Sequence, residues 1–425
     1  MKLEEKIIEI LKEGFICDNC LGRFFSELLS GFSNKERGRI LRNYLAFLLD
    51  SGEKIEVDTS NFYGIKFRNI KLEIKEPGKC RICGNFFEKE IDELAKKIVE
   101  ELKGIEFQTF LIGSIPRDEM LNEEEKLQEK VGIEFSETIK SEINRELGKR
   151  VEKLSGKDFA LKNPDITIIV NLKTGKIKKE IRSLFIYGKY KKLVRGIPQS
   201  KWVCPNCGGK GCVECKGTGK LYPTSVQEEI EKPLLKETKA KKSAFHAEGR
   251  EDIDARCLDY RPFVIELIKP LKRKINLKEM EKKINKSKKV KVKLLGFANR
   301  ELVVKIKSEK SEKTYQAEVE FEKEIDKEKM KELKKLEGQA ILQKTPTRVL
   351  HRRSDKVRKR IVKKISWKLI GKKKCIFKIR AQSGLYIKEL ISGDQGRTNP
   401  NISELISNKP KKIKLDVIKI HKVER

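Results

Sequence analysis

The sequence predicts an α+β protein of two or three domains, with a mostly antiparallel mixed sheet in its C-terminal half. Its 425 residues exceed the size of a single hydrophobic core. Apolar residues in the N-terminal part recur at helical spacing, whereas several later segments alternate apolar and polar residues, which is the period of a half-buried strand. Helical segments between those strands would cover one face of the sheet.

The net charge of +34 is spread along the whole chain, which indicates an extended polyanion as the partner. A membrane surface is the alternative, but the sequence has neither a run of about 18 apolar residues nor a basic amphipathic helix with aromatic anchors. The first residues include acids and have no apolar signal-peptide core, so we expect a cytoplasmic protein. We also expect a monomer.

Helices are expected over residues 3–11 and 34–49 and at the start of the segment 86–135, which should continue as a solvated acidic loop. A further helix is expected from residue 136, followed by strands over 163–170 and 183–187. The end of the second strand and the basic loop after it combine tyrosines with cations, which suits RNA because rings stack on bases and cations meet phosphates. The alternative is an ordinary sheet with a basic rim. The candidate RNA-binding residues here are Tyr187, Lys189, Tyr190 and Arg195.

Eight of the ten cysteines form four Cys-x-x-Cys pairs, which in an unexported chain favours metal over disulfides. Because the chain has only three histidines, the ligands would be thiolates. Cys17, Cys20, Cys80 and Cys83 form two knuckles, each with a glycine close behind, and are expected to close one tetrahedral structural zinc site. Two reduced pairs without metal are the alternative.

The other two pairs are Cys204 with Cys207 and Cys212 with Cys215, separated by only four residues and rich in glycine. They either enclose a second zinc or form a glycine-rich linker between domains. The spacing resembles the zinc modules of DnaJ-type chaperones. In either case a domain boundary is expected nearby, which gives an accessory domain over residues 1–200 and a second domain over 201–425.

Beyond this linker, strands are expected over residues 263–268, 290–297, 302–306, 315–321 and 375–379, with a solvated helix over 327–336. Between the linker and the first of these strands lies a charge-dense stretch, residues 245–263, with three aspartates, two glutamates and three arginines. Read alone, it is either a solvated loop with weak ion pairs or a site in which Asp252, Asp254 or Asp259 is a reactive carboxylate.

Three separated motifs in this half resemble the pseudouridine synthases. Gly249-Arg-Glu-Asp252 resembles their Gly-Arg-x-Asp turn, and Lys313-Thr-Tyr315-Gln-Ala-Glu-Val319 resembles their Lys-x-Tyr-x-Ala-x-Val strand. Ser383-Gly-Leu-Tyr-Ile-Lys388 resembles the bacterial motif Gly-Thr-Tyr-Ile-Arg, although Leu385 stands where related motifs often have threonine. The segment 257–260 is a second departure, because the family usually has a glycine-rich turn there.

At the level of one family, the chain resembles the archaeal-type tRNA pseudouridine synthase acting at positions 54 and 55, through residues 247–263, 344–355 and 386–400. Asn163-Pro-Asp-Ile166 and the strand into Tyr187-Gly-Lys-Tyr190 look like a THUMP domain, which implies docking on the acceptor end of tRNA. The resemblance therefore implies a zinc-containing THUMP-like tRNA-binding domain and a C-terminal pseudouridine synthase catalytic domain.

The resemblance also implies residue roles. Asp252 would be the nucleophile, with Asp254 and Asp259 as competitors, and Tyr315 would stack on the uracil. Burial disfavours an ionised carboxylate, and Lys388 placed nearby would oppose that effect. No redox change occurs in the reaction, so no organic cofactor is expected. Substrate-binding roles fall to Arg250 at a phosphate, to Ile387 and Leu415 as apolar walls, and to Arg352 and Arg353 in the basic loop 351–360 as a clamp on the RNA backbone.

Two other classes of protein compete with this interpretation. The first is a zinc-stabilised tRNA-binding protein or chaperone without chemistry of its own. The second is a THUMP-bearing methyltransferase or thiolase, but the C-terminal half lacks the glycine-rich nucleotide loop or pyrophosphate loop that these enzymes need.

Overall fold

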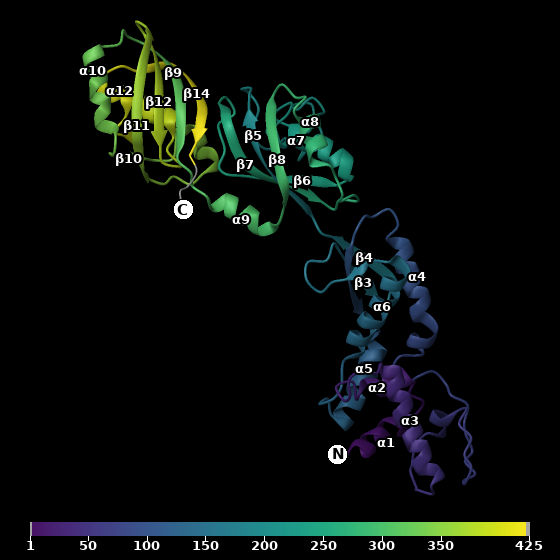
Figure 1. The fold of residues 1–425 in the computed structure, drawn as a ribbon. Helices are drawn as coiled ribbons and strands as arrows, with labels where there is room; N and C mark the ends of the chain where they lie inside the picture. The colour runs from purple at the N-terminus through teal and green to yellow at the C-terminus, as the bar shows by residue number, and fades with distance from the viewer. Residues whose placement is uncertain (1, 422–425) are drawn as a thin grey trace. The chain divides into compact units, whose positions relative to one another are not determined.

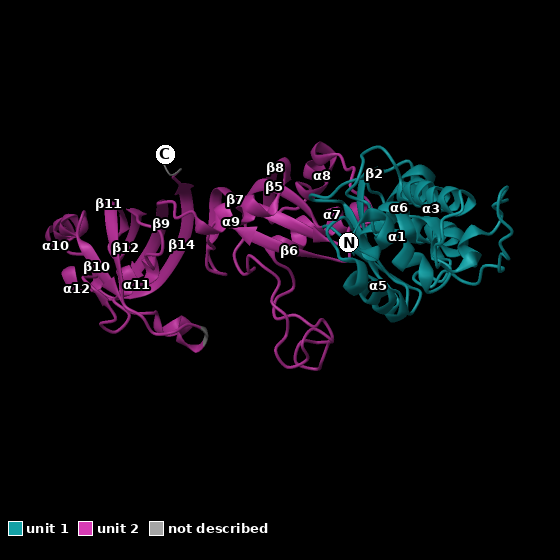
Figure 2. Cartoon of the chain, turned by 90° about the horizontal axis from the view of Figure 1, so that it is seen from below, with its two compact units in different colours: residues 1–182 teal, residues 183–425 magenta. Residues whose placement is uncertain are grey.

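The computed structural model describes residues 2–421 apart from the side chain of Arg352, and it divides the chain into two compact units (Figure 2). Unit 1 is Met1–Arg182 and unit 2 is Ser183–Arg425. The division therefore precedes the expected boundary at residue 200. The reason is that Leu184–Lys192 forms a strand whose partners lie in unit 2, a pairing that local sequence cannot reveal.

Unit 1 combines helices with a small sheet of strand order β2-β1-β3-β4 (Figure 1). Strand β1 runs parallel to β2 and β3, and β4 runs antiparallel to β3. The first half holds α1 Leu3–Lys12, α2 Asp18–Arg23, α3 Asn34–Asp50, the 3-10 turn η1 Thr59–Phe62 and the short π-helix η2 Phe86–Glu90. The second half holds α4 Ile91–Glu101, β1 Thr109–Ile115, α5 Asp118–Val131, α6 Ile139–Ser155, β2 Asp158–Phe159, β3 Ile166–Asn171 and β4 Lys176–Ile181.

The expected acidic loop within residues 86–135 was wrong, because that region contains helix α5. Met120, Leu127 and Val131 recur at helical spacing and are buried. Between them Glu124 turns inward, where its carboxylate accepts a hydrogen bond of 2.9 Å from Nε of buried Arg23. Because the charged Glu124 lies on the buried face, the apolar spacing alone does not predict this helix.

Unit 2 is built on one ten-stranded sheet of order β13-β10-β11-β12-β9-β14-β7-β5-β8, with β6 paired to β7. Among the described strands of this sheet only β14 and β7 pair in parallel, which confirms a mostly antiparallel mixed sheet. The strands are β5 Leu184–Lys192, β6 Lys242–Ala247, β7 Arg256–Ile268, β8 Val290–Ala298, β9 Lys313–Phe321, β10 Ala340–Gln343, β11 Arg358–Gly371, β12 Lys374–Ala381, β13 Thr398–Asn399 and β14 Pro410–Ile420. The helices are α7 Val226–Thr238, α8 Leu277–Ile284, α9 Arg300–Ser308, α10 Lys327–Lys331, η3 Glu332–Leu336, η4 Thr347–Arg352, α11 Ile387–Ser392 and α12 Ile402–Leu405.

Four of the five strands expected in unit 2 lie within β7, β8, β9 and β12 and are confirmed. The fifth, over residues 302–306, was wrong, because this segment lies in helix α9. The Asn299 side chain accepts a hydrogen bond from the Leu302 backbone N–H and so caps that helix. Val303 and Ile306 then pack on Val264 of β7.

The seam between β7 and β14 joins the two halves of the sheet, and a buried carboxylate stabilises it. Asp416 of β14 lies opposite Arg256 of β7. Asp416 Oδ2 lies 2.7 Å from Arg256 Nη2, and its Oδ1 lies 2.6 Å from Arg195 Nη2. Arg195 also donates a hydrogen bond to the carbonyl oxygen of Leu415, so it ties the strands at the seam together. Its expected role as an RNA contact stays a prediction.

Within residues 2–421, no helix is both long enough and apolar enough to cross a bilayer.

We predict that Asp416→Asn lowers the free energy of unfolding by about 2 kcal/mol, because two half-exposed arginines lose the charge of their buried partner. The control is Glu318→Gln, which removes an exposed pair with Lys414 at 3.5 Å and should cost less than about 1 kcal/mol. Urea unfolding followed by circular dichroism measures both changes. Equal effects of the two variants would contradict a structural role for the seam.

Candidate active site

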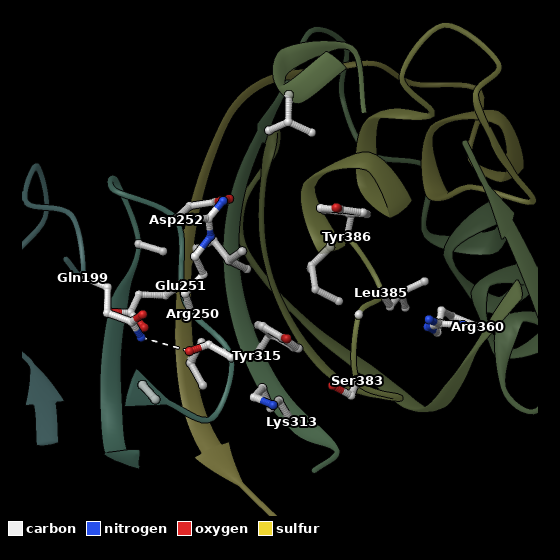
Figure 3. A pocket seen from close by; sticks show the side chains of 18 of the residues that line it. Gln199, Arg250, Glu251, Asp252, Lys313, Tyr315, Arg360, Ser383, Leu385 and Tyr386 are labelled. Atoms are coloured by element: carbon white, nitrogen blue, oxygen red, sulfur yellow. Dashed lines mark hydrogen bonds between the residues drawn. The ribbon is translucent and has the colours of Figure 1, made fainter. Parts of the chain in front are cut away.

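A cavity of about 610 Å³ lies within unit 2, and the residues of the three motifs meet around it (Figure 3). Asp252 comes from the loop between β6 and β7, Tyr315 from β9 and Leu415 from β14. The turn before α11 supplies Leu385, and the first residue of α11 is Ile387. Segments more than 150 residues apart in the chain thus form one site.

The loop that carries Asp252 is fixed from beneath by buried cations. Lys192 Nζ donates hydrogen bonds of 3.0 Å to the carbonyl oxygens of Asp252 and Ile253. Arg261 Nη1 donates one of 2.7 Å to the carbonyl oxygen of Glu248. Both cations are fully buried, and burial lowers the pKa of Lys192. The backbone of the loop is therefore held at both ends.

The loop begins with a glycine whose conformation other residues rarely adopt. Gly249 has a φ of +67°, and its carbonyl oxygen accepts a hydrogen bond of 2.9 Å from Nε2 of Gln199, which is the contact drawn in Figure 3. Two residues later, Glu251 turns into the protein, where its carboxylate lies 3.2 Å from Arg261 Nε and accepts a hydrogen bond from Tyr190 Oη. Glu251 is therefore engaged within the protein, while Asp252, the next residue, is the more exposed of the two carboxylates.

Arg348 is the closest described cation to Asp252, and sequence reasoning assigned it no role. Its Nη1 and Nη2 lie 3.0 Å from the two carboxylate oxygens of Asp252, and its Nε lies 2.7 Å from Glu389. Burial opposes the charge on Arg348, but the hydrogen bond and charge of Glu389, followed by those of Asp252, raise its pKa. Arg348 lies within the family-like segment 344–355, but a resemblance over a whole segment does not show which side chain reaches the site.

Lys388 lies near Asp252, as expected, but it is closer to Asp254. Its Nζ is 3.6 Å from Asp252 Oδ2 and 2.6 Å from Asp254 Oδ2. Burial works against ionisation of Asp254, yet the hydrogen bond and charge of Lys388 lower its pKa. The other competitor, Asp259, lies in β7 and accepts hydrogen bonds from the backbone N–H groups of Tyr260 and Ile420. Among the three aspartates, only Asp252 lines the main cavity.

Tyr315 lies in the wall of the cavity, on the same face of β9 as buried Ala317 and Val319. Burial raises the pKa of Tyr315 to about 12, so its phenol is protonated at neutral pH. Ile387 and Leu415 are buried and complete the apolar part of the lining. A planar, uncharged ring would find both an aromatic surface and apolar walls here.

Cations surround the opening of this cavity. Arg250 and Arg353 are exposed and line it, and Arg353 Nη1 donates a hydrogen bond of 2.7 Å to Tyr386 Oη. The side chain of Arg352 lies outside the described part of the chain. Sequence reasoning missed the further lining cations Lys307, Lys313, Arg358 and Arg360.

The tyrosines and lysine of the expected RNA-binding loop belong to strand β5 of unit 2. Tyr190 is fully buried between Phe245 and Phe263 and cannot stack on a base, which corrects its expected role. Tyr187 packs partly buried against the cluster around Val264 on the opposite side of the strand. The period of two along a strand separates these tyrosines. Lys189 shares the side of Tyr187 and does not line the cavity.

The four sulfur atoms of Cys17, Cys20, Cys80 and Cys83 lie within 4.8 Å of one another, and all four residues are buried. Tetrahedral zinc–thiolate bonds of about 2.3 Å place sulfurs about 3.8 Å apart, and Cys17 and Cys83 are separated by 3.6 Å. Arg23 Nη1 donates to Cys20 Sγ over 3.4 Å, which would offset the negative charge of a tetrathiolate centre. The donor set and its surroundings fit a metal ion.

Cys204, Cys207, Cys212 and Cys215 form a second tetrad of the same compactness but with two partly exposed members. The sulfurs of Cys204 and Cys212 are 3.8 Å apart. The backbone N–H of Gly211 points to Cys207 Sγ at 3.2 Å, and that of Gly219 points to Cys215 Sγ at 3.1 Å. Amide donors aimed at sulfur stabilise thiolates, so the geometry of this second cluster also fits a metal ion.

Comparison with known families agrees with this architecture. Residues 185–421 match the family model described as "Pus10, C-terminal", and residues 94–171 match "Pus10 THUMP domain, archaeal". The chain is therefore a pseudouridine synthase that carries a THUMP domain, as the motifs predicted.

Curated relatives extend the match to nearly the whole chain. Proteins named "tRNA pseudouridine synthase Pus10" from Methanothrix thermoacetophila and Methanopyrus kandleri are 40% and 41% identical to it, each over 97% of this chain and over 93% and 97% of their own lengths. The chain belongs to the Pus10 family. Among solved structures, a Cbf5-Nop10-Gar1 complex aligns with a TM-score of 0.29 and 13% identity, over 55% of this chain and 48% of that chain, a similarity too weak to add to the assignment.

We predict that Arg348→Ala lowers kcat/KM for pseudouridine formation by roughly a hundredfold, because Asp252 loses a charged partner that contacts both of its oxygens. Glu389→Gln is the control, since it removes a neighbouring charge from Arg348 and leaves the contact with Asp252 in place. Its activity should remain within about tenfold of the parent protein. If both variants lose activity equally, Arg348 acts through the fold and not on Asp252.

Proposed function

We propose that this protein isomerises uridine to pseudouridine in the T arm of tRNA, at positions 54 and 55, with Asp252 as the nucleophile. The observation that carries the proposal is the position of Asp252, an acid beside two cations at the edge of a cavity with one aromatic wall. The names of the curated relatives support tRNA as the substrate. The choice of the T arm rests on the family-like segments of the sequence.

The reaction breaks the bond between N1 and ribose C1′, turns the uracil, and joins C5 to C1′. The proton on C5 is lost and N1 gains one, so no electrons enter or leave. Asp252 can serve as an anion either by attacking C1′ or by removing the 2′-proton to give a glycal. Arg348 and Lys388 place opposite charge beside it, which stabilises a carboxylate anion.

Tyr315 would hold the uracil by stacking while the base turns. Because its phenol is protonated at neutral pH, with its pKa raised to about 12 by burial, the ring contributes surface and not a phenolate. The apolar side chains of Ile387 and Leu415 would exclude water from the reacting carbon. Arg250 and Arg353 at the opening suit phosphates on either side of an extruded nucleotide. We also place Arg352 in this clamp, from the basic sequence around it.

In unit 1, the THUMP domain would bind the acceptor end of tRNA. A monomer in the cytoplasm remains our expectation. We further propose that both cysteine tetrads hold structural zinc, on the strength of their sulfur spacing and of the amide and guanidinium donors directed at the sulfurs. Zinc would cross-link the loops that carry the thiolates and contribute to folding, and no step of the reaction would pass through it.

The central test is pseudouridine formation in unmodified tRNA transcripts, mapped by carbodiimide treatment and primer extension. Asp252→Ala should lower the rate more than about a thousandfold at both positions. Asp254→Asn is the matched control and should stay within about tenfold, because Asp254 is largely exposed and pairs with Lys388. Transcripts in which cytidine replaces the uridine at position 54 or at position 55 leave one target each, so they show which of the two positions is modified. Activity retained by Asp252→Ala would refute the nucleophile, and an inactive parent protein would favour a binding protein.

Metal content gives a separate prediction. Purified protein should contain two zinc ions per chain, and Cys17→Ser and Cys204→Ser should each lower that number by one. Because the first tetrad is fully buried, Cys17→Ser should also lower the thermal stability more than Cys204→Ser. Elemental analysis and differential scanning calorimetry measure the two effects. If the parent protein contains one zinc ion per chain and Cys204→Ser does not lower that number, the second cluster is a metal-free linker.

A further inference from the structure

Asp252 separates two cavities, and only one of them is used by the reacting uridine. The second has a volume of about 300 Å³, which is at the lower limit of typical ligand pockets. It shares five lining residues with the main cavity, namely Gln199, Arg250, Glu251, Asp252 and Arg348, so the two cavities lie next to each other at Asp252. Residues found only in the second hollow include Pro198, Trp202, Asp254 and Lys388.

Trp202 gives the second cavity an aromatic surface, and the cysteine module holds it there. The backbone carbonyl oxygen of Trp202 accepts a hydrogen bond of 3.1 Å from Leu221 N–H, and Val203 forms a β-bridge with Lys220. The indole ring makes an edge contact of 5.7 Å with the ring of Tyr222. These three contacts close the stem from which residues 204–215 project, so the module fixes the position of the ring.

The charges around this cavity suit a nucleotide. Arg250, Arg348 and Lys388 line it, and each of its three carboxylates is paired with a cation: Asp252 with Arg348, Asp254 with Lys388, and Glu251 with Arg261. An indole beside cations is the combination that binds a base and its phosphate. Position supports the same ligand, because a ribose that reacts at Asp252 is linked through its own phosphates to the next nucleotide on each side.

We propose that the cavity lined by Trp202 is a subsite for the nucleotide adjacent to the target uridine, whose base stacks on the indole while the uracil occupies the Tyr315 side. The inference rests on the proposed function and extends it, since it adds a second base contact on the opposite side of Asp252. It also gives the cysteine module a part in substrate binding.

The test combines protein variants with altered RNA. Trp202→Ala should lower kcat/KM by about tenfold to a hundredfold on an intact T-arm stem-loop. An RNA that is abasic next to the target uridine should show a similar loss of kcat/KM with the parent protein when the abasic nucleotide lies on one side of the target, and little loss when it lies on the other side. With that abasic RNA, Trp202→Ala should have no further effect. Trp202→Phe should restore most of the rate, and Trp367→Phe on β11 is the control. The proposal would be overturned if Trp202→Ala lowered kcat/KM by the same factor on intact RNA and on both abasic RNAs.

A second measurement uses the native Trp202 and needs no activity. The chain has two tryptophans, so Trp367→Phe leaves Trp202 as the single reporter, and Asp252→Ala in the same protein prevents turnover. Intact RNA should quench the fluorescence of Trp202, whereas RNA that is abasic at the coupled position should bind with less quenching. Equal quenching by both RNAs would also overturn the subsite. The proposed function is judged separately, by whether the parent protein modifies intact RNA.

Discussion

Two buried cations that bind backbone carbonyl oxygens are the interaction on which the catalytic site depends. Lys192 and Arg261 hold the loop between β6 and β7 by its own main chain, so the direction of the Asp252 side chain is set before any substrate arrives. A buried cation is costly unless it finds such partners. The carbonyl oxygens of the loop therefore supply hydrogen-bond partners for the two buried cations, and the same hydrogen bonds hold the loop in place. The carboxylate of Asp252 is therefore preorganised, which is what the nucleophile role proposed for it would require.

Much of the fold could be predicted because its signals are local. The alternation of β9 and β12 and the helical spacing of α3 and α6 are visible in the sequence. Pairing is not local, and so β5 could not be assigned to unit 2 from its own residues. Helices α5 and α9 were missed because each depends on contacts that are distant in sequence. A buried ion pair stabilises α5, and α9 packs through Val303 and Ile306 against the sheet.

The candidate site divides in the same way. Asp252, Tyr315, Ile387 and Leu415 could be placed because the motifs around them resemble a known family, and the structure brings all four to one cavity. Arg348 lies in a family-like segment too, but its contact with Asp252 depends on how that segment folds back to the carboxylate, which the sequence does not reveal. Tyr190 shows the opposite failure. A tyrosine among lysines suggests a surface that binds RNA, but the period of the strand turns this ring into the core.

The position of β14 has a consequence for the order in which the enzyme is completed during synthesis. Asp416 closes the seam with Arg256, which is 160 residues earlier in the chain, and its neighbour Leu415 lines the cavity. A nascent chain that has emerged only as far as α12 already carries Asp252, Tyr315 and Lys388, but it lacks β14, which supplies Leu415 to the cavity wall and Asp416 to the tie across the sheet. The residues proposed for catalysis are thus all made before the cavity is complete, so we expect that β14 must leave the ribosome before uridine can be modified.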